Sequence, residues 1–357
     1  VALATLLCLP PAALAQQDAA NPAELANDGW AAVEARRFGD ALAAFTAASE
    51  QVPDEPTFWF GGGLAAYMLG RTEDAEVLLE RALNLEPWLA DAARLLGELY
   101  YHTGRVQDAI ATYEAALGHA PDDPDFVDTL EEWKRENQLQ DRFYVSRGAH
   151  FRVLFEGPTD DALARRVVEM LEAAYWRVGG ELRTYPPQAI TVVLYTQEQF
   201  QDITRSPAWA AGAYDGQIRV PVRGALDRRA ELDRVLTHEF VHALVAVLGS
   251  RTVPVWLNEG LATVFEPGGL NRATEVLASA TSQPALGDLH GSFAGLSGAR
   301  ARIAYALSAV AVDRMISLRG APAVVLLLKD LARGVPFASA FHRRIALRYD
   351  EFERMVR

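Results

Sequence analysis

The sequence ALAAFTAASEQVP at residues 41–53 returns in altered form 34 residues later as AEVLLERALNLEP (75–87), and again as AIATYEAALGHAP (109–121). Each copy begins with alanine, ends in proline and carries a large side chain at its fifth position: Phe45, Leu79 and Tyr113. A glycine stands 12 residues before each copy, at Gly29, Gly63 and Gly97. Small residues let paired helices approach closely, the large side chain fills the seam, and proline ends the second helix. The stretch therefore predicts a stack of helix pairs.

The period of this stack, with its order of small, aromatic and proline positions, resembles the tetratricopeptide repeat (TPR). The resemblance implies an α-helical solenoid over residues 16–141, with repeats at about 22–55, 56–89 and 90–123 and a capping helix over 125–140. Such a stack usually presents a concave face to a peptide or protein, so a protein partner or substrate is expected there. The alternative is a spacer or a brace against the rest of the chain.

The 34-residue period ends at about Phe143, and strand and helix patterns mix from there on. Alternating or β-branched residues predict strands over 151–155, 189–195 and 218–222. Helical spacing follows over 160–178, 227–248, 255–265, 271–280, 301–318 and 321–332. Strands followed by helices predict an α+β domain over residues 142–357.

The segment THEFVHAL at residues 237–244 holds the candidate chemistry of this second domain. His238 and His242 stand four residues apart on one face of the predicted helix, so both imidazoles can reach one metal ion. Glu239 extends from the same helix toward the cleft, where it can take a proton from a metal-bound water. The alternative is a helix that carries two histidines for other reasons.

A third ligand is expected from PVWLNEGLA at residues 254–262, which begins the next helix. Glu259 on that helix completes a His₂Glu set and leaves the fourth position of a zinc ion for water. The neighbouring Gly260 and Ala262 are small, as is needed where two helices cross closely. The alternative for Glu259 is a solvated acid stabilised by the helix dipole.

These two segments resemble the gluzincin clan of zinc metallopeptidases, and within it the peptidase-MA-like domains often found beside TPR repeats. The resemblance covers roughly residues 145–357 and includes GAYDG (212–216) and AYALS (304–308). It implies a thermolysin-like fold, Zn²⁺ held by His238, His242 and Glu259, and peptide-bond hydrolysis with Glu239 as general base and then acid.

Further roles follow from the same resemblance. Tyr305 matches a tyrosine that donates a hydrogen bond to the tetrahedral oxyanion; its alternative is ordinary packing of an amphipathic helix. Asn258 and Thr263 are expected to orient the metal ligands. The strand at 218–222 is expected to form the edge of the cleft, where an extended peptide can pair with it.

One departure from related aminopeptidases restricts the prediction. Those enzymes carry a Gly-x-Met-Glu-Asn motif whose glutamate holds the free amine of the substrate, whereas residues 211–222 contain no glutamate. Aminopeptidase activity therefore does not carry over, and endopeptidase action or cleavage of a non-peptide amide stays open. The alternative functions are a weak or inactive peptidase-like scaffold that acts through its repeats, and an adaptor whose His-Glu-x-x-His motif is fortuitous.

The charge of the chain argues against nucleic acid or an anionic membrane as the main partner. The 357 residues carry a formal net charge of −13. Lys134 and Lys329 are the only lysines, and the arginines are scattered among acids, so no basic stripe forms. Beyond residue 15, no stretch is long and apolar enough to predict a membrane span.

The first fifteen residues predict an export signal. An apolar run at residues 1–9 leads, after two prolines, into Ala13-Leu14-Ala15, a cleavage site of the A-x-A kind. The alternative is a buried apolar terminus. Cys8 is the only cysteine and lies inside this segment, so the mature chain is expected to use neither disulfides nor thiolate chemistry, in a periplasmic or secreted location.

Overall fold

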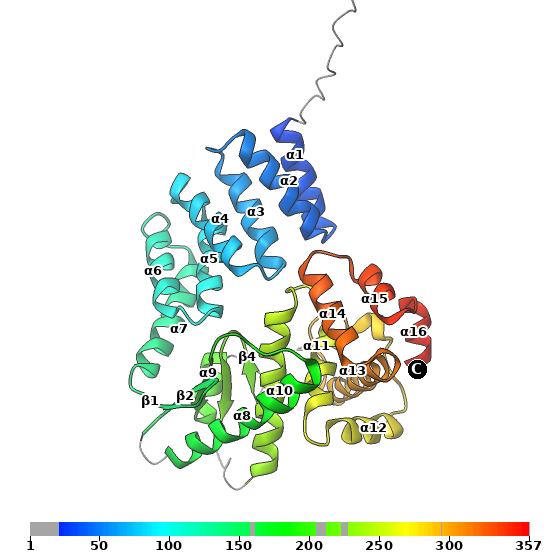
Figure 1. The fold of residues 1–357 in the computed structure, drawn as a ribbon. Helices are drawn as coiled ribbons and strands as arrows, with labels where there is room; N and C mark the ends of the chain where they lie inside the picture. Colours follow the sequence, from blue (N-terminus) through cyan, green and yellow to red (C-terminus); the bar gives the residue numbers. More distant parts are fainter. Residues whose placement is uncertain (1–20, 158–160, 205–211, 223–227, 294, 357) are drawn as a thin grey trace, which may run out of the picture.

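The computed structural model describes residues 21–157, 161–204, 212–222, 228–293 and 295–356, and it has two regions (Figure 1). The predicted signal segment at residues 1–15 lies outside the described residues. No helix in the described part of the chain has both the length and the apolar character needed to cross a membrane.

The first region is a stack of paired helices that follow one another in an arc along one side of the second region (Figure 1). The pairs are α1 (Pro22–Glu34) with α2 (Phe38–Gln51), α3 (Pro56–Met68) with α4 (Thr72–Leu85), and α5 (Ala90–His102) with α6 (Val106–Leu117). A longer helix, α7 (Pro124–Gln140), closes the stack. The predicted helical repeat region and its capping helix are therefore present.

The seams between paired helices are packed as the repeated positions predict. The ring of fully buried Phe45 lies so close to Gly29 and Gly61 that a Cβ atom on either glycine would approach it to 2.9 or 2.5 Å. In the next two repeats, Leu79 and Tyr113 occupy the same place against Gly63 and Gly97. Contacts under 3.0 Å are far inside ordinary packing distances, so these seams require glycine.

The second region begins with a five-stranded mixed sheet in the order β1-β2-β3-β5-β4. Strands β2, β3 and β5 are parallel, while β1 and β4 pair antiparallel at the two edges. The strands are β1 (Tyr144–Arg147), β2 (Phe151–Phe155), β3 (Ile190–Tyr195), β4 (Ala213–Tyr214) and β5 (Ile218–Pro221). Side chains alternate along β2, so that Phe151 and Val153 join the main core with α8 (Asp161–Leu182), whereas Leu154 packs beside α9 (Gln197–Thr204) on the opposite face.

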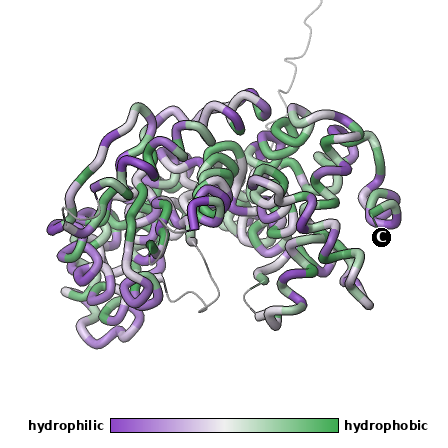
Figure 2. The backbone as a smooth tube through the Cα atoms, turned by 90° about the horizontal axis from the view of Figure 1, so that it is seen from below, coloured by the Kyte–Doolittle hydropathy of each residue, from purple (hydrophilic) through white to green (hydrophobic). Residues whose placement is uncertain are grey.

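Helices make up the rest of this region and bury a large apolar core. They are α10 (Arg229–Leu248), α11 (Val255–Phe265), α12 (Gly269–Ser279), α13 (Gly298–Arg319), α14 (Ala321–Ala332), α15 (Phe337–Ile345) and α16 (Tyr349–Val356). Figure 2 shows that hydrophobic and hydrophilic stretches alternate along the helices of both regions. The predicted α+β class is therefore confirmed.

The expected role of residues 218–222 as the edge of the cleft is wrong. Strand β5 pairs with β3 on one side and with β4 on the other, and Ile218, Arg219 and Val220 are buried. The edge is instead β4, which consists of two residues. So short a strand carries too little alternation to be recognised in a sequence.

Candidate metal centre

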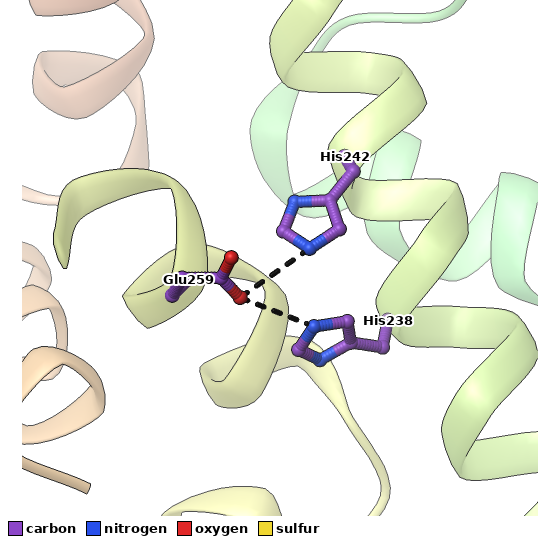
Figure 3. Close-up of side chains that lie close together, drawn as sticks. All are labelled: His238, His242 and Glu259. Carbon is purple, nitrogen blue, oxygen red and sulfur yellow. Dashed lines mark ion pairs between the residues drawn. The ribbon is translucent and has the colours of Figure 1, made fainter. Parts of the chain in front are cut away.

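Two neighbouring helices bring the three predicted metal ligands together (Figure 3). His238 and His242 extend from α10, and Glu259 extends from α11 toward both of them. The Oε2 atom of Glu259 lies 3.3 Å from Nε2 of His238 and 3.4 Å from Nε2 of His242. Among the residues that the structure describes, no other group of three or more His, Cys, Asp or Glu side chains meets the geometric requirement for holding one metal ion.

The donor types, and the spacing of Glu259 from each histidine, are compatible with a tetrahedral metal ion such as zinc. Ligands about 2.0–2.1 Å from a tetrahedral centre stand about 3.3–3.4 Å from one another, which is the spacing between Glu259 and the two histidines. The same Oε2 atom is buried and makes no hydrogen bond with the described residues. A buried carboxylate oxygen without a hydrogen bond is costly unless a cation compensates it, so the site is suited to a metal.

Each histidine is oriented through its second ring nitrogen. Nδ1 of His238 lies 2.7 Å from Oε1 of Glu266, and Nδ1 of His242 lies 3.0 Å from Oδ1 of Asn258. With Nδ1 donating to these oxygens, Nε2 of both rings is free to face a metal. The structure thus supports the expectation for Asn258. Thr263 is different, because its buried hydroxyl finds no partner among the described residues.

Glu266 is the site residue that sequence reasoning missed. It lies just beyond the end of α11, where it is 7% exposed and accepts contacts from Arg234 at 3.4 Å and Arg272 at 2.6 Å. Burial favours its protonated form, but the hydrogen bond from His238 and the nearby arginines lower the pKa of Glu266 below the ordinary value. Its pairing with a histidine 28 residues away leaves no local signal in the sequence.

The charge balance of the site favours a cation. Burial alone would lower the pKa of His238, but the carboxylates of Glu259 and Glu266 raise it to about 10. The pKa of Glu259 moves in the opposite direction: burial would raise it, and the two histidines bring it below its usual range. Carboxylates that favour a proton on His238 equally favour a metal cation between them.

Glu239 lies beside the ligands and is shielded from bulk water. Glu239 is 6% exposed. Burial raises the pKa of its carboxyl above the ordinary value, although His242 and His238 oppose this shift. The backbone of Gly212 covers this carboxyl so closely that a Cβ atom there would lie 2.6 Å from Oε1. A raised pKa brings a carboxylate nearer to the value that suits a general base at neutral pH.

Tyr305 enters the site from α13. Its ring centre lies 6.4 Å from that of His238, and the ring of Phe293 meets it edge-on at 5.3 Å. Burial raises the pKa of the Tyr305 phenol, and the carboxylates of the site raise it further, so the hydroxyl keeps its proton. Tyr305 therefore lies near the ligands with a protonated hydroxyl that is able to donate a hydrogen bond.

Comparison with known proteins identifies the first region. Two family models, both described as tetratricopeptide repeat, match residues 28–87 and 66–130. Residues 28–130 are tetratricopeptide repeats. The chain is also 26% identical over 101 residues to small glutamine-rich tetratricopeptide repeat-containing protein 2 of Mycosarcoma maydis. That similarity covers 28% of this chain and 29% of the relative, and TPR stacks characteristically bind protein segments.

The TPR region touches the second region through the turns that join its paired helices. In the first repeat Gly39 lies against Gly334, and in the second Met68 accepts a hydrogen bond at 3.1 Å from the backbone of Arg251. In the third, Nδ1 of His102 lies 2.7 Å from the carbonyl oxygen of Asp215.

Proposed function

We propose that this protein is an exported zinc-dependent metallopeptidase of the gluzincin type, with a thermolysin-like second domain and TPR repeats that bind a protein partner or substrate. The observation that carries the proposal is the convergence of His238, His242 and Glu259 on one point, with Glu239 buried beside them. A mixed sheet with an antiparallel edge strand next to the histidine-bearing helix is consistent with this fold.

Each residue has a defined task in this reaction. A bound zinc ion would lower the pKa of a water to about 7 and polarise the scissile carbonyl. Glu239 would take a proton from the attacking water as the water oxygen bonds to the carbonyl carbon, and would deliver this proton to the amine nitrogen as the C–N bond breaks. Tyr305 donates a hydrogen bond to the oxyanion. Glu266 and Asn258 fix the orientation of the two histidine rings through hydrogen bonds to Nδ1.

The proposed substrate is a protein or peptide. No glutamate occurs in residues 211–222 to hold a free α-amine, so the proposal does not extend to aminopeptidase action. The export proposal rests on the apolar run and A-x-A site of residues 1–15, which would direct the enzyme to a periplasm or outside the cell.

Metal analysis combined with a cleavage assay tests the proposal. The purified protein should contain about one zinc per chain by mass spectrometry, since a His₂Glu site binds one ion. His238→Ala should lose that zinc, whereas Glu239→Gln should keep it and lose cleavage of a generic protein such as casein. Wild-type protein that takes up no zinc even when zinc is supplied would refute the proposal. Zinc without cleavage would favour the scaffold alternative.

A further inference from the structure

The hairpin of β4 and β5 connects the metal site to the TPR region. At one end, the backbone of Gly212 lies against the carboxyl of Glu239. At the other end, the turn of the hairpin at residues 215–217 meets the end of α5 in the third repeat. A displacement of this turn would therefore be transmitted along a short, paired hairpin toward the general base.

The contact between α5 and the turn is unusually close. Gly216 has a φ of +107°, and a Cβ atom there would fall 1.6 Å from the carbonyl oxygen of His102. The imidazole of His102 bonds through Nδ1 to the carbonyl of Asp215. Burial lowers the pKa of His102 to about 4, so the ring is neutral at ordinary pH and its Nδ1–H donates this bond. Only glycine fits the turn while α5 stays in place.

A buried ion pair fixes the same hairpin to the capping helix. Arg219 of β5 is fully buried and reaches Oε1 of Glu136 on α7 through Nη2 at 2.8 Å and Nε at 3.1 Å. Its Nη2 also donates to the hydroxyl of Tyr101 on α5 at 2.9 Å. A third group, Asp215, pairs with Nη1 of the same arginine. Breaking a buried pair by removing one partner is strongly unfavourable, so this cluster resists separation of the two regions.

The loop that joins the two metal-bearing helices is held by the preceding repeat. The guanidinium of Arg251 lies 3.9 Å from the ring centre of Tyr67, and its backbone N–H donates to Met68. Nearby, Gly70 approaches the carbonyl oxygen of Gly249 so closely that a Cβ atom would lie 2.8 Å away. Successive repeats thus contact two different segments of the second region: this loop, which joins the ligand-bearing helices, and the turn of the β4–β5 hairpin.

We propose that the TPR region positions the catalytic apparatus, with His102 as a positioning residue that holds the β4–β5 hairpin against Glu239. The part of this proposal that concerns turnover rests on the proposed function; the part that concerns the hairpin does not. It follows that the two regions act as one unit, and that a displacement of the TPR stack is transmitted to the metal site through this hairpin.

Two glycine substitutions in the full-length protein test the proposal. Gly216→Ala drives the hairpin away from His102. Gly334→Ala is the matched control, because Gly334 also has a positive φ, of +81°. A Cβ atom there would likewise meet the TPR region, at Gly39 2.9 Å away, but no residue of the metal site lies at that contact. The measurements are hydrogen exchange of residues 213–221, zinc content, and kcat and KM on casein.

We expect Gly216→Ala to speed hydrogen exchange in the hairpin by about tenfold or more while zinc content stays unchanged. In the same variant kcat should fall by about tenfold or more, with a smaller change in KM, since Glu239 is displaced but the ligands are not. Gly334→Ala should change none of these. Wild-type exchange and kcat in Gly216→Ala would overturn the proposal.

Two further arms keep the test decisive. If Gly216→Ala does not fold, His102→Ala serves in its place, because it removes the bond to Asp215 without a clash. His102→Ala should also speed hydrogen exchange in the hairpin and lower kcat. Wild-type values of both in that variant would overturn the proposal. If wild-type protein binds zinc but cleaves nothing, the proposed function fails, and the exchange measurement alone still decides whether the TPR region holds the hairpin.

Discussion

Glu266 accepts a hydrogen bond from Nδ1 of His238, and this bond determines which nitrogen of the ring faces Glu259. Removal of such an outer partner typically weakens metal binding by about 10–100-fold. We therefore expect Glu266→Ala to lower zinc affinity by that factor, measured by competition with a coloured chelator. Glu275→Ala, which removes an exposed acid from α12, is the control and should leave affinity unchanged. Equal affinities in the two variants would contradict the role given to Glu266.

The role of Tyr305 can be tested by removing a single oxygen atom. Tyr305→Phe removes the hydroxyl and keeps the ring that packs against Phe293. Loss of one oxyanion donor costs about 10²–10³ in kcat, so we expect a decrease of that size with zinc content unchanged. Tyr349→Phe is a suitable control, because its hydroxyl contacts His290 outside the site. Unchanged kcat in Tyr305→Phe would leave the residue with a packing role.

At the scale of elements, the sequence predicts best where one element has a strong pattern of its own. The bounds of α11 and α14 were predicted to the residue, since Pro254 and Gly320 stand immediately before them. Strand β1 and helices α9, α15 and α16 were not predicted, because four to nine residues provide at most two or three turns or one short alternation.

The need for a local pattern also explains which site residues the sequence predicts. His238, Glu239 and His242 share one helix at fixed spacing, so they could be found without knowing the fold. Glu266 could not, because its partnership with His238 exists only once α10 and α11 pack together. The close approach of Gly212 to Glu239 likewise depends on how the β4–β5 hairpin lies over α10.

The crossing of α11 and α13 gives a prediction at this scale. A Cβ atom on Gly260 would lie 2.3 Å from the carbonyl oxygen of Ser308, which is backbone and cannot move aside cheaply. Overpacking of this kind costs about 1–3 kcal/mol or more, so Gly260→Ala should lower the free energy of unfolding by at least that amount in urea titrations. Gly180→Ala is the matched control: it is exposed on α8 and open to a methyl group, and should stabilise slightly.

At the scale of the whole molecule, the contacts between the regions are spread over three repeats. Gly39, Met68 and His102 each lie at or near the turn of a different repeat, and each meets a different part of the second region. A single hinge between residues 141 and 142 could not move one region without breaking all three contacts. We therefore expect wild-type protein to unfold in one cooperative calorimetric transition.

The pair of Glu136 and Arg219 should carry much of that cooperativity, because both side chains are at most 1% exposed and bulk solvent therefore does not screen their charges. Glu136→Gln leaves the guanidinium with its charge and only Asp215 as an acidic partner. Breaking a buried pair costs about 3–5 kcal/mol, so we expect a lower melting temperature and separate unfolding of the TPR stack in calorimetry.

Glu114→Gln is the matched control: it breaks a pair with Lys134 on the same capping helix, but those side chains are 52% and 41% exposed. An exposed pair contributes about 0–1 kcal/mol, so that variant should melt like the wild type. A Glu136→Gln profile that cannot be distinguished from that of Glu114→Gln would mean that the repeats are joined to the second region by chain connectivity and apolar packing alone.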